Sequence, residues 1–438
     1  MFENKKIFIF GMARSGYEAA KLLAKYNNKI VLVDAKAQDE DKILELKKLN
    51  VEIYIDEESS KYLDKSFDYV IKNPGISNEN ELIKKANNLN TPVINEIEMA
   101  YHFLPKVKLI CITGSNGKTT TTTIIYNMIK RYTNNVHMCG NMGIPLSKML
   151  EEIKENDILV MEISSQQLNN FKDFKPDIAV LTNLIPVHID FFENYENYKN
   201  VKKRIFKNFD DDSLAILNME NEDVVNLTND IKGIKQYFSS KRKTDCYYGN
   251  NIIYYKNEKI IDTKDIVVKG IHNYENIMCA IMVMKKLNIP NNIIVDELKE
   301  FKGVEHRIEY VKELNGRKFY NDSKATNTVS TRIALDSFTT PTILIMGGLD
   351  RGHSFDELNE HLKNVKYIIC YGQTKERIKK WSPVECKVVE NLEEATKKAY
   401  ELSNSGDTIL LSPACASWDQ FSSFEQRGDL YKKIINEL

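Results

Sequence analysis

The sequence predicts an α/β protein of three domains. Apolar, strand-like runs alternate with helical segments along all 438 residues, and this alternation restarts near residues 95 and 300. Several apolar runs end in glycine-containing turns, which is typical of parallel strands that lead into helices. We therefore expect domains over residues 1–95, 96–300 and 301–438.

Composition excludes several classes of protein. The chain carries 61 basic and 62 acidic residues, a formal net charge of −1, so we expect no nucleic-acid partner. Its seven scattered cysteines, without a Cys-x-x-Cys motif, are typical of reduced thiols in the cytoplasm. The N-terminus lacks a signal-peptide pattern, and no run approaches the roughly 20 apolar residues of a membrane span. We expect a cytoplasmic protein that does not bind a membrane.

The first domain begins with a strand, a glycine turn and a helix. Lys6–Phe10 is a short apolar run, Gly11–Gly16 forms the turn, and Ile30–Asp34 is a second strand that ends in an acid. That acid either binds a ribose or caps the next loop. The βαβ pattern predicts a Rossmann-like N-terminal domain, although Ala13 replaces the middle glycine of the dinucleotide fingerprint. A third strand, Tyr69–Ile71, runs into a Pro-Gly turn at the strand end where α/β proteins bind ligands.

The second domain contains a candidate phosphate loop. The run Thr113–Thr123 follows the apolar strand Val107–Ile112 and precedes a helix that we expect to begin near Thr119. Backbone N–H groups of such a loop cradle phosphates, Lys118 reaches the terminal phosphates, and the hydroxyl of Thr119 can bind Mg²⁺. The alternative is an ordinary glycine-rich turn. Because a strand precedes the loop and a helix follows it, the pattern favours nucleotide binding and predicts a central P-loop ATPase-type domain.

Two polar side chains follow neighbouring strands of this domain. Glu162 ends the apolar run 157–162, and His188 comes soon after the run 178–183. Because the carboxyl ends of parallel strands meet at one edge of a sheet, both residues are expected near the phosphate loop. Glu162 either holds Mg²⁺ together with Thr119 or faces water. His188 is either a ligand or acid–base group, which we favour, or a structural residue.

Lys202 lies on the apolar side of a helical pattern over Tyr195–Phe209. Tyr198, Ile205 and Phe206 share that side by their spacing. A lysine on an apolar stripe can extend its amine to solvent. The alternative is a functional amine with a lowered pKa. A neutral amine can add CO₂ and become a carbamate, which is an oxygen ligand for a metal.

Further polar motifs follow. Asn273 and Asn276 lie one turn apart at the start of a helix that we expect to end near Leu287, and they either read an adenine edge or cap the helix. Arg307, at the start of the third domain, is suited to bind a phosphate.

The third domain repeats the strand–helix alternation. Strands are expected over residues 341–346, 367–371 and 407–411, which predicts a Rossmann-like C-terminal domain. The run Tyr320–Asn327 contains an acid, a base and hydroxyls, and Ser412–Phe421 follows the last strand. Such density of polar groups at strand ends favours a binding site over a solvated turn.

Together these motifs resemble the Mur ligases, which are ATP-dependent, amide-forming enzymes of peptidoglycan synthesis. The resemblance covers essentially the whole chain. The runs Asn321–Asn327 and Ser412–Phe421 look like the branch that adds D-glutamate, and the Asp-Asn-Pro-Arg signature of the diaminopimelate- or lysine-adding branch is absent.

The resemblance implies ligation of D-glutamate to UDP-N-acetylmuramoyl-L-alanine through an acyl phosphate, carried out by a monomer. It implies that the three domains bind the UDP substrate, ATP and the amino acid in that order. The implied catalytic residues are Lys118, Glu162, His188 and Lys202. Two Mg²⁺ ions are implied, with ligands from Thr119, Glu162, His188 and a carbamylated Lys202.

The resemblance also implies binding residues for each substrate. ATP would contact Gly114, Ser115, Asn116, Gly117, Lys118, Thr119, Thr120, Asn273, Asn276, Arg307 and Asp322. The UDP substrate would contact Arg14, Ser15, Asp34, Asn73, Gly75 and Asn141. D-glutamate would contact Lys324, Thr326, Ser417 and Phe424.

Three positions depart from the family pattern. Val187 stands where an acid is frequent, Trp418 replaces a more usual aliphatic residue, and Arg351 stands in a loop that carries a lysine in some members. Two rival functions remain. Folylpolyglutamate synthetase would lack a domain like residues 1–95, and a regulatory P-loop NTPase would leave Lys202 and the Ser417 loop without a purpose.

Overall fold

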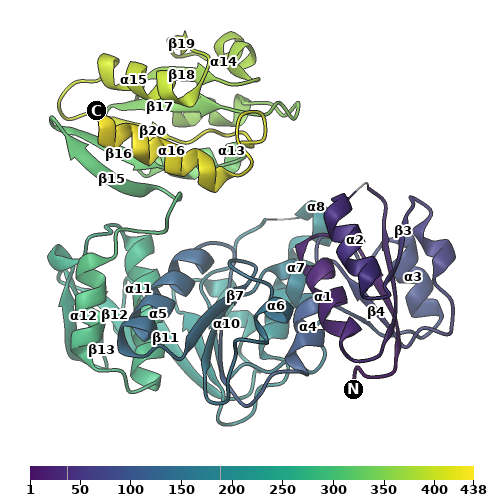
Figure 1. Cartoon of the computed structure of the whole chain (residues 1–438). Coiled ribbons are helices and arrows are strands. Elements are labelled where there is room, and N and C mark those ends of the chain that lie inside the picture. The colour runs from purple at the N-terminus through teal and green to yellow at the C-terminus, as the bar shows by residue number, and fades with distance from the viewer. Residues whose placement is uncertain (37, 188) are drawn as a thin grey trace. The chain divides into compact units, whose positions relative to one another are not determined.

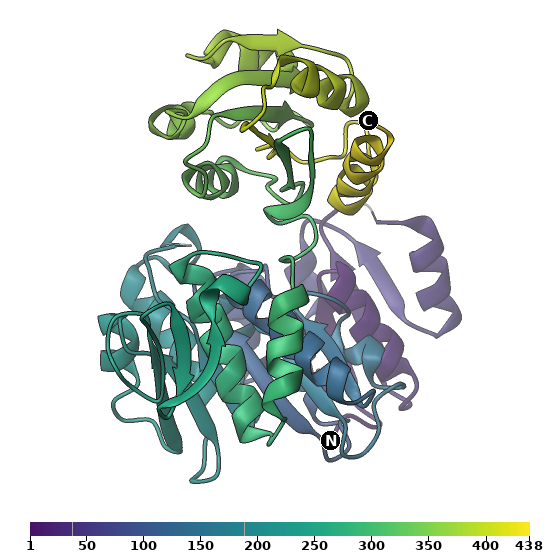
Figure 2. The same cartoon turned by 90° about the vertical axis from the view of Figure 1, so that its left-hand side faces the viewer.

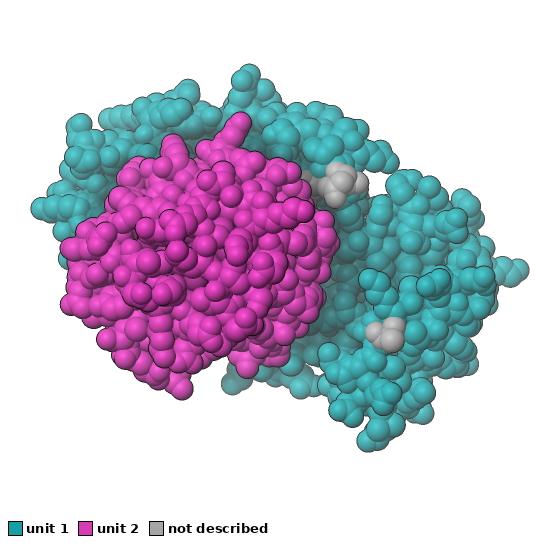
Figure 3. Space-filling model, turned by 90° about the horizontal axis from the view of Figure 1, so that it is seen from above, with its two compact units in different colours: residues 1–301 teal, residues 302–438 magenta. Residues whose placement is uncertain are grey.

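The computed structural model describes residues 1–36, 38–187 and 189–438. Among these residues the chain forms three sheets (Figure 1) and divides into two compact units, residues 1–301 (unit 1) and 302–438 (unit 2), which Figure 3 colours separately. None of the described helices is both long enough and apolar enough to cross a membrane.

Unit 1 begins with a parallel sheet of order β3-β2-β1-β4-β5. Its strands are β1 (Lys6–Phe10), β2 (Lys29–Asp34), β3 (Glu52–Ile55), β4 (Tyr69–Lys72) and β5 (Val93–Ile94). Its helices are α1 (Arg14–Ala24), α2 (Glu40–Lys48) and α3 (Glu81–Asn88), with a 3-10 turn at Ser59–Tyr62. The strands predicted at Lys6–Phe10, Ile30–Asp34 and Tyr69–Ile71 are therefore confirmed. The order of strands reverses between β1 and β4, which is where open α/β sheets bind ligands.

The second sheet of unit 1 has the order β14-β13-β12-β11-β10-β9-β6-β8-β7. Its strands are β6 (Lys108–Thr113), β7 (Val136–Gly140), β8 (Ile158–Glu162), β9 (Ile178–Leu181), β10 (Leu214–Asn218), β11 (Ile234–Ser239), β12 (Cys246–Gly249), β13 (Ile252–Tyr255) and β14 (Glu258–Asp262). The strand β6 pairs in parallel with both β8 and β9, and all three are almost entirely buried, as their continuous apolar runs predict. The strands β12 to β14 form an antiparallel meander.

Helices flank this second sheet. They are α4 (Glu96–Tyr101), α5 (Lys118–Tyr132), α6 (Leu146–Met149), α7 (Ser165–Leu168), α8 (Ile189–Phe192), α9 (Tyr195–Lys203), α10 (Glu222–Leu227), α11 (Ile271–Lys286) and α12 (Asn291–Glu300), with 3-10 turns at Arg204–Phe206 and Thr263–Asp265. The helices α11 and α12 pack beside α5, as Figures 1 and 2 show. The helix expected over Tyr195–Phe209 ends earlier, at Lys203, and continues as the 3-10 turn. One hydrophobic core runs from the first sheet into the second, so the expected division near residue 95 stays a prediction.

Unit 2 contains a sheet of order β15-β16-β20-β17-β18-β19. Its strands are β15 (Glu309–Leu314), β16 (Arg317–Asn321), β17 (Thr342–Gly347), β18 (Val365–Tyr371), β19 (Cys386–Val388) and β20 (Thr408–Leu411). Its helices are α13 (Thr328–Asp336), α14 (Lys375–Trp381), α15 (Leu392–Leu402) and α16 (Phe424–Glu437), with a 3-10 turn at Asp356–His361. Separate clusters of buried apolar residues cover the two faces of the sheet. The hairpin β15–β16 turns at Asn315 and Gly316, whose positive φ angles of 51° and 75° suit an Asn-Gly turn.

Candidate active site

The loop between β6 and α5 requires glycine at two positions. Gly114 has a φ of 145°, and a Cβ atom on it would lie 2.0 Å from the Oγ1 atom of Thr182. Gly117 has a φ of 81°, and a Cβ atom on it would lie 2.3 Å from the Oδ1 atom of Asn276. The backbone therefore passes too close to its neighbours for a side chain at either position. The helix α5 begins at Lys118, with Gly117 as its N-cap residue.

The end of β9 holds the loop in place. The Ser115 N–H donates to the carbonyl oxygen of Asn183 at 2.9 Å, and the Asn116 N–H donates to the Oδ1 atom of Asn183 at 2.9 Å. The Thr182 hydroxyl donates to the carbonyl oxygen of Asn116 at 2.6 Å. Sequence reasoning gave Thr182 and Asn183 no role. Their place directly after a buried strand beside β6 is the signal that identifies them.

Lys118 lies against the loop that precedes it. Its Nζ atom donates to the carbonyl oxygens of Gly114 at 2.9 Å and Ser115 at 2.8 Å. The Ser115 hydroxyl lies 2.8 Å from the hydroxyl of Tyr198 on α9. This contact links the loop to α9. Thr120, another expected ATP residue, lies in the first turn of α5.

Thr119 and Glu162 meet at the ends of β6 and β8. The Thr119 hydroxyl donates to the Oε2 atom of Glu162 at 2.7 Å, and the Asn141 amide donates to the Oε1 atom at 2.7 Å. Glu162 is 2% exposed, so the alternative in which it faces water is wrong. Asn141, which we expected to contact the UDP substrate, here supports the carboxylate of Glu162.

Lys202 is buried beside the same loop, with 1% of its surface exposed. Its Nζ atom donates to the Oγ1 atom of Thr113 at 2.8 Å and to the carbonyl oxygen of Gly114 at 3.0 Å. The alternative in which Lys202 extends its amine to solvent is therefore wrong. Burial holds the pKa of Lys202 well below its ordinary value, the charge of Lys118 lowers this pKa further, and Glu162 opposes the shift.

Three further residues of unit 1 were expected to bind ATP or a metal, namely His188, Asn273 and Asn276. His188 lies outside the described residues. Asn276 accepts a hydrogen bond from the Thr121 hydroxyl at 3.2 Å and lies against Gly117, so it supports the loop from α11. The Asn273 amide donates to the carbonyl oxygen of Lys269 at 2.8 Å. Neither asparagine is the N-cap residue of α11, because Gly270 occupies that position.

The expected residues of the first sheet gather where β1, β2 and β4 end. Asp34 accepts hydrogen bonds from the backbone N–H groups of Met12 at 2.6 Å and Lys36 at 2.9 Å, so it fixes the glycine turn as well as the loop that follows it. The Asn73 amide donates to the Ser15 hydroxyl at 3.2 Å.

Two further contacts fix the same edge. The Oδ1 atom of Asn73 accepts from the N–H of Gly75 at 3.0 Å. The guanidinium of Arg14 donates to the carbonyl oxygen of Gly143. Arg14 therefore links the first glycine turn to the loop that follows β7.

Lys72 was not anticipated from the sequence. It ends β4 and is 1% exposed, and its Nζ atom donates to the carbonyl oxygen of Ile76 at 2.5 Å. Burial lowers its pKa to about 8. Lys72 therefore closes the turn that carries Asn73 and Gly75.

The expected residues of unit 2 lie at the ends of β16 and β20. Asp322 is buried, and its carboxylate accepts from the Ser412 hydroxyl at 2.7 Å and from the Ile308 N–H at 3.2 Å. Burial raises the pKa of Asp322 to about 7, while the two hydrogen bonds and the charges of Arg307 and Arg427 oppose that shift.

The expected amino-acid residues come from three segments of unit 2. The Nζ atom of Lys324 lies 5.7 Å from the centre of the Phe424 ring. The N–H of Thr326 donates to the carbonyl oxygen of Lys324 at 2.9 Å, and Ser417 is buried. The segments of Lys324 and Phe424 therefore meet within this unit.

Two of the positions that depart from the family pattern contact each other. The guanidinium of Arg351 lies 4.9 Å from the centre of the Trp418 ring, within the range of a cation–π interaction. Trp418 is exposed. The two departures therefore form one local contact next to Ser417.

Comparison with known proteins identifies the family. A family model described as Mur ligase middle domain matches residues 112–284, and one described as Mur ligase, glutamate ligase domain matches residues 306–415. A protein of Bacillus cereus (strain ATCC 10987 / NRS 248) named UDP-N-acetylmuramoylalanine–D-glutamate ligase is 40% identical over 444 residues, covering 100% of this chain and 98% of its own length. A relative of the same name from Bacillus thuringiensis (strain Al Hakam) has the same identity and coverage.

Solved structures share the fold at low identity. UDP-N-acetylmuramate-alanine ligase MurC from Thermotoga maritima matches with a TM-score of 0.59 at 18% identity, over 99% of each chain. MurF ligase from the same organism, solved in complex with ADP, matches with a TM-score of 0.56 at 18% identity, over 99% of this chain and 96% of its own. These likenesses confirm the predicted α/β fold class. By its full-length relatives and by both family models, this chain belongs to the Mur ligase family.

Proposed function

We propose that the chain catalyses ATP-dependent ligation of D-glutamate to UDP-N-acetylmuramoyl-L-alanine, a cytoplasmic step of peptidoglycan synthesis. The observation that carries this proposal is the 40% identity, along the whole chain, to ligases of that name. Full-length matching includes residues 1–95, which the rival folylpolyglutamate synthetase would lack. Membership of a ligase family also argues against a purely regulatory NTPase.

The proposed reaction proceeds in two steps. The L-alanyl carboxylate attacks the γ-phosphorus of ATP, which gives an acyl phosphate and ADP. The amine of D-glutamate then attacks the acyl carbon, the tetrahedral intermediate loses phosphate, and the amine proton leaves to a base. Because a carboxylate and a triphosphate repel each other, the site must supply positive charge between them.

The residues around the phosphate loop suit the first step. The start of α5 and the loop before it offer backbone N–H groups to phosphate oxygens. Lys118 already donates to two loop carbonyls, and its amine would turn to the β- and γ-phosphates. Asn273 and Asn276, on α11, would contact the adenine side of ATP.

The donor set of unit 1 fits Mg²⁺. The Thr119 hydroxyl and the Glu162 carboxylate are hard oxygen ligands that lie within 2.7 Å of each other, and Mg²⁺ prefers oxygen ligands. We propose that they hold one ion and that His188 and a carbamate on Lys202 hold a second. Bound Mg²⁺ would neutralise the triphosphate and the carboxylate as they approach. The lowered pKa of Lys202 supports the carbamate, because only a neutral amine adds CO₂.

Two further sets of residues would bind the remaining substrates. Arg14, Ser15, Asp34, Asn73, Gly75 and Asn141 would bind the UDP substrate. Lys324, Thr326, Ser417 and Phe424 would bind D-glutamate, and Arg307 and Asp322 would complete the ATP site. We also propose that the enzyme acts as a monomer without a nucleic-acid or membrane partner, and its net charge of −1 supports the absence of nucleic acid.

The test is an ADP-release assay across a panel of UDP-muramoyl acceptors and amino acids. We expect ADP release to require UDP-N-acetylmuramoyl-L-alanine, D-glutamate and Mg²⁺ together. Release that is independent of D-glutamate, or that another amino acid supports better, would overturn the proposal.

A further inference from the structure

Arg427 is a completely buried cation in unit 2, with 0% of its surface exposed. Its Nε atom donates to the Ser323 hydroxyl oxygen at 2.9 Å, its Nη2 atom donates to the Ser323 carbonyl oxygen at 2.7 Å, and its Nη1 atom donates to the Cys415 carbonyl oxygen at 3.1 Å. All three acceptors are neutral. Within the described part of the chain, no carboxylate forms an ion pair with this guanidinium. A buried charge without an ion pair is unfavourable for stability. The charge of Arg427 also acts on the buried carboxyl of Asp322, whose pKa it lowers.

The position of Arg427 along its helix adds to this cost. The helix α16 begins at Phe424, so Arg427 lies in its first turn, close to the positive end of the helix dipole. An acidic side chain would be more stable there than a cation. Helix stability therefore does not account for an arginine at this position.

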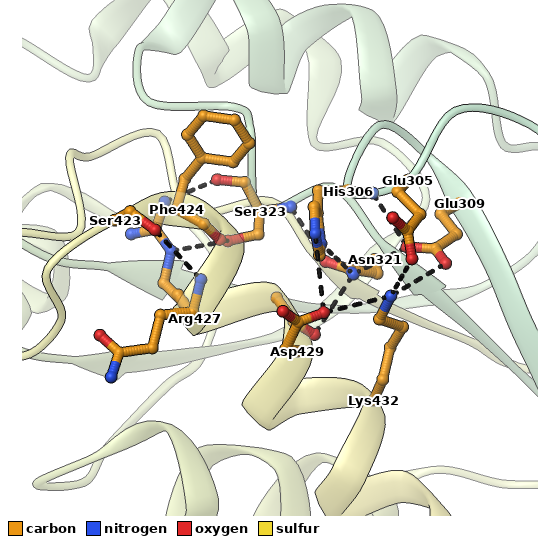
Figure 4. Close-up of polar contacts among 12 residues, drawn as sticks. Glu305, His306, Glu309, Asn321, Ser323, Ser423, Phe424, Arg427, Asp429 and Lys432 are labelled. Atoms are coloured by element: carbon orange, nitrogen blue, oxygen red, sulfur yellow. Dashed lines mark hydrogen bonds and ion pairs between the residues drawn. The ribbon is translucent and has the colours of Figure 1, made fainter. Parts of the chain in front are cut away.

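The three segments of the proposed D-glutamate site meet at this guanidinium, as Figure 4 shows for Ser323, Phe424 and Arg427. Ser323 directly precedes Lys324, and Cys415 comes two residues before Ser417. The Ser323 hydroxyl also donates to the carbonyl oxygen of Phe424 at 2.8 Å. One side chain thus joins the loop after β16, the loop after β20 and the start of α16.

We infer that Arg427 is a positioning residue for the amino-acid substrate. Its guanidinium holds the segments of Lys324, Ser417 and Phe424 in a fixed relation. Its positive charge, which no ion pair offsets among the described residues, favours a ligand with two carboxylates nearby. This inference rests on the proposed function, because D-glutamate is the dicarboxylic substrate of that reaction.

The test compares Arg427→Lys and Arg427→Met with the wild-type enzyme in steady-state ADP release. Losing hydrogen bonds to a charged group is expected to raise the KM for D-glutamate by about 10-fold to 100-fold, with the Met variant more affected than the Lys variant. The KM for the UDP substrate is expected to stay within about twofold, since its proposed binding residues belong to unit 1 and none of them contacts Arg427 among the described residues.

Arg317→Lys is the matched control. Arg317 begins β16, at the opposite end of the strand from Ser323, and its guanidinium also donates to a serine, Ser403, at 2.9 Å to the hydroxyl and at 2.9 Å to the carbonyl oxygen. It supports the same sheet without touching the proposed site. We expect its KM for D-glutamate to equal the wild-type value.

Ser323→Ala keeps the test decisive if the Arg427 variants do not fold. It removes the link to Phe424 and one of the three acceptors of Arg427, and a rise in the KM for D-glutamate of about threefold to tenfold is expected. A folded variant with an unchanged KM for D-glutamate, or with the KM for the UDP substrate raised to the same extent, would overturn the inference. Wild-type enzyme that does not require D-glutamate would instead overturn the proposed function, and this inference with it.

Discussion

Replacing Lys202 with alanine tests the central chemical proposal. The substitution removes the hydrogen bonds from the Nζ atom to Thr113 and Gly114. Both acceptors keep another partner, because the Thr113 hydroxyl also donates to the carbonyl oxygen of Ile163 and the Gly114 carbonyl also accepts from Lys118. The loss of unfolding free energy should therefore stay at roughly 2–4 kcal/mol, as for other large-to-small substitutions in a core.

The expected loss of turnover is much larger than that loss of stability suggests. If Lys202 carries a carbamate that binds metal, removing it should lower kcat by at least roughly 10²–10³, the effect of deleting one preorganised electrostatic group. The space left by the side chain should admit a small carboxylate. Added acetate should therefore restore part of the activity in an ADP-release assay.

Lys203→Ala is the control for this experiment. Lys203 is the next residue of α9, and its Nζ atom pairs with Asp230 at 2.6 Å and 2.9 Å on the surface, where solvent screens such contacts. The Lys203→Ala enzyme should turn over at the wild-type rate, and added acetate should not change its activity. Wild-type turnover by folded Lys202→Ala, or an equal effect of acetate on both variants, would refute the reasoning.

Three further predictions follow from the two units. Glu162→Gln should still bind ATP in a calorimetric titration but lose Mg²⁺-dependent turnover, and full turnover would exclude Glu162 from the metal site. Gly117→Ala should weaken ATP binding by at least about tenfold, because at a φ of 81° the added Cβ atom would lie 2.3 Å from the Oδ1 atom of Asn276. Unchanged affinity would show that the loop tolerates a side chain there. Asp322 is protonated in the native state between its ordinary pKa of 3.8 and its raised pKa of about 7, while the unfolded carboxyl is ionised there, so this group makes the unfolding free energy fall as pH rises through that window. In denaturant titrations between about pH 4 and 7, Asp322→Asn should reduce the pH-dependent decrease of the unfolding free energy by roughly 4 kcal/mol. A pH dependence equal to that of the wild type would contradict the raised pKa of Asp322.

Local patterns in the sequence predict much of the fold. Continuous apolar runs mark β6, β8 and β9, because strands buried on both faces need apolar residues throughout. The glycines of the phosphate loop can also be predicted from the sequence, because Gly114 and Gly117 adopt backbone conformations that other residues rarely adopt. The position of Glu162 near the phosphate loop can be predicted because the carboxyl ends of parallel strands lie at one edge of the sheet.

Contacts between distant segments are not visible in such patterns. Nothing local to Arg427 indicates that it reaches Ser323, and nothing near Asn141 indicates that it supports Glu162. Lys72 reads as an ordinary polar strand end, yet tertiary packing buries it. Burial and pairing of this kind depend on which elements the topology brings together, and the spacing of residues within one element does not contain that information.

The strand order of the central sheet also constrains when this site can form. In β6, Lys108 pairs with Ile158 of β8 and Ile110 pairs with Ile178 of β9, so each neighbour of the phosphate-loop strand arrives long after it in the chain. Such non-local pairing must wait for loop closure and slows folding. During synthesis from the N-terminus, the loop can be fixed by Asn183 only after β9 has left the ribosome. A nascent chain that stops before that strand should not retain nucleotide, even though its Gly-Lys-Thr motif is complete.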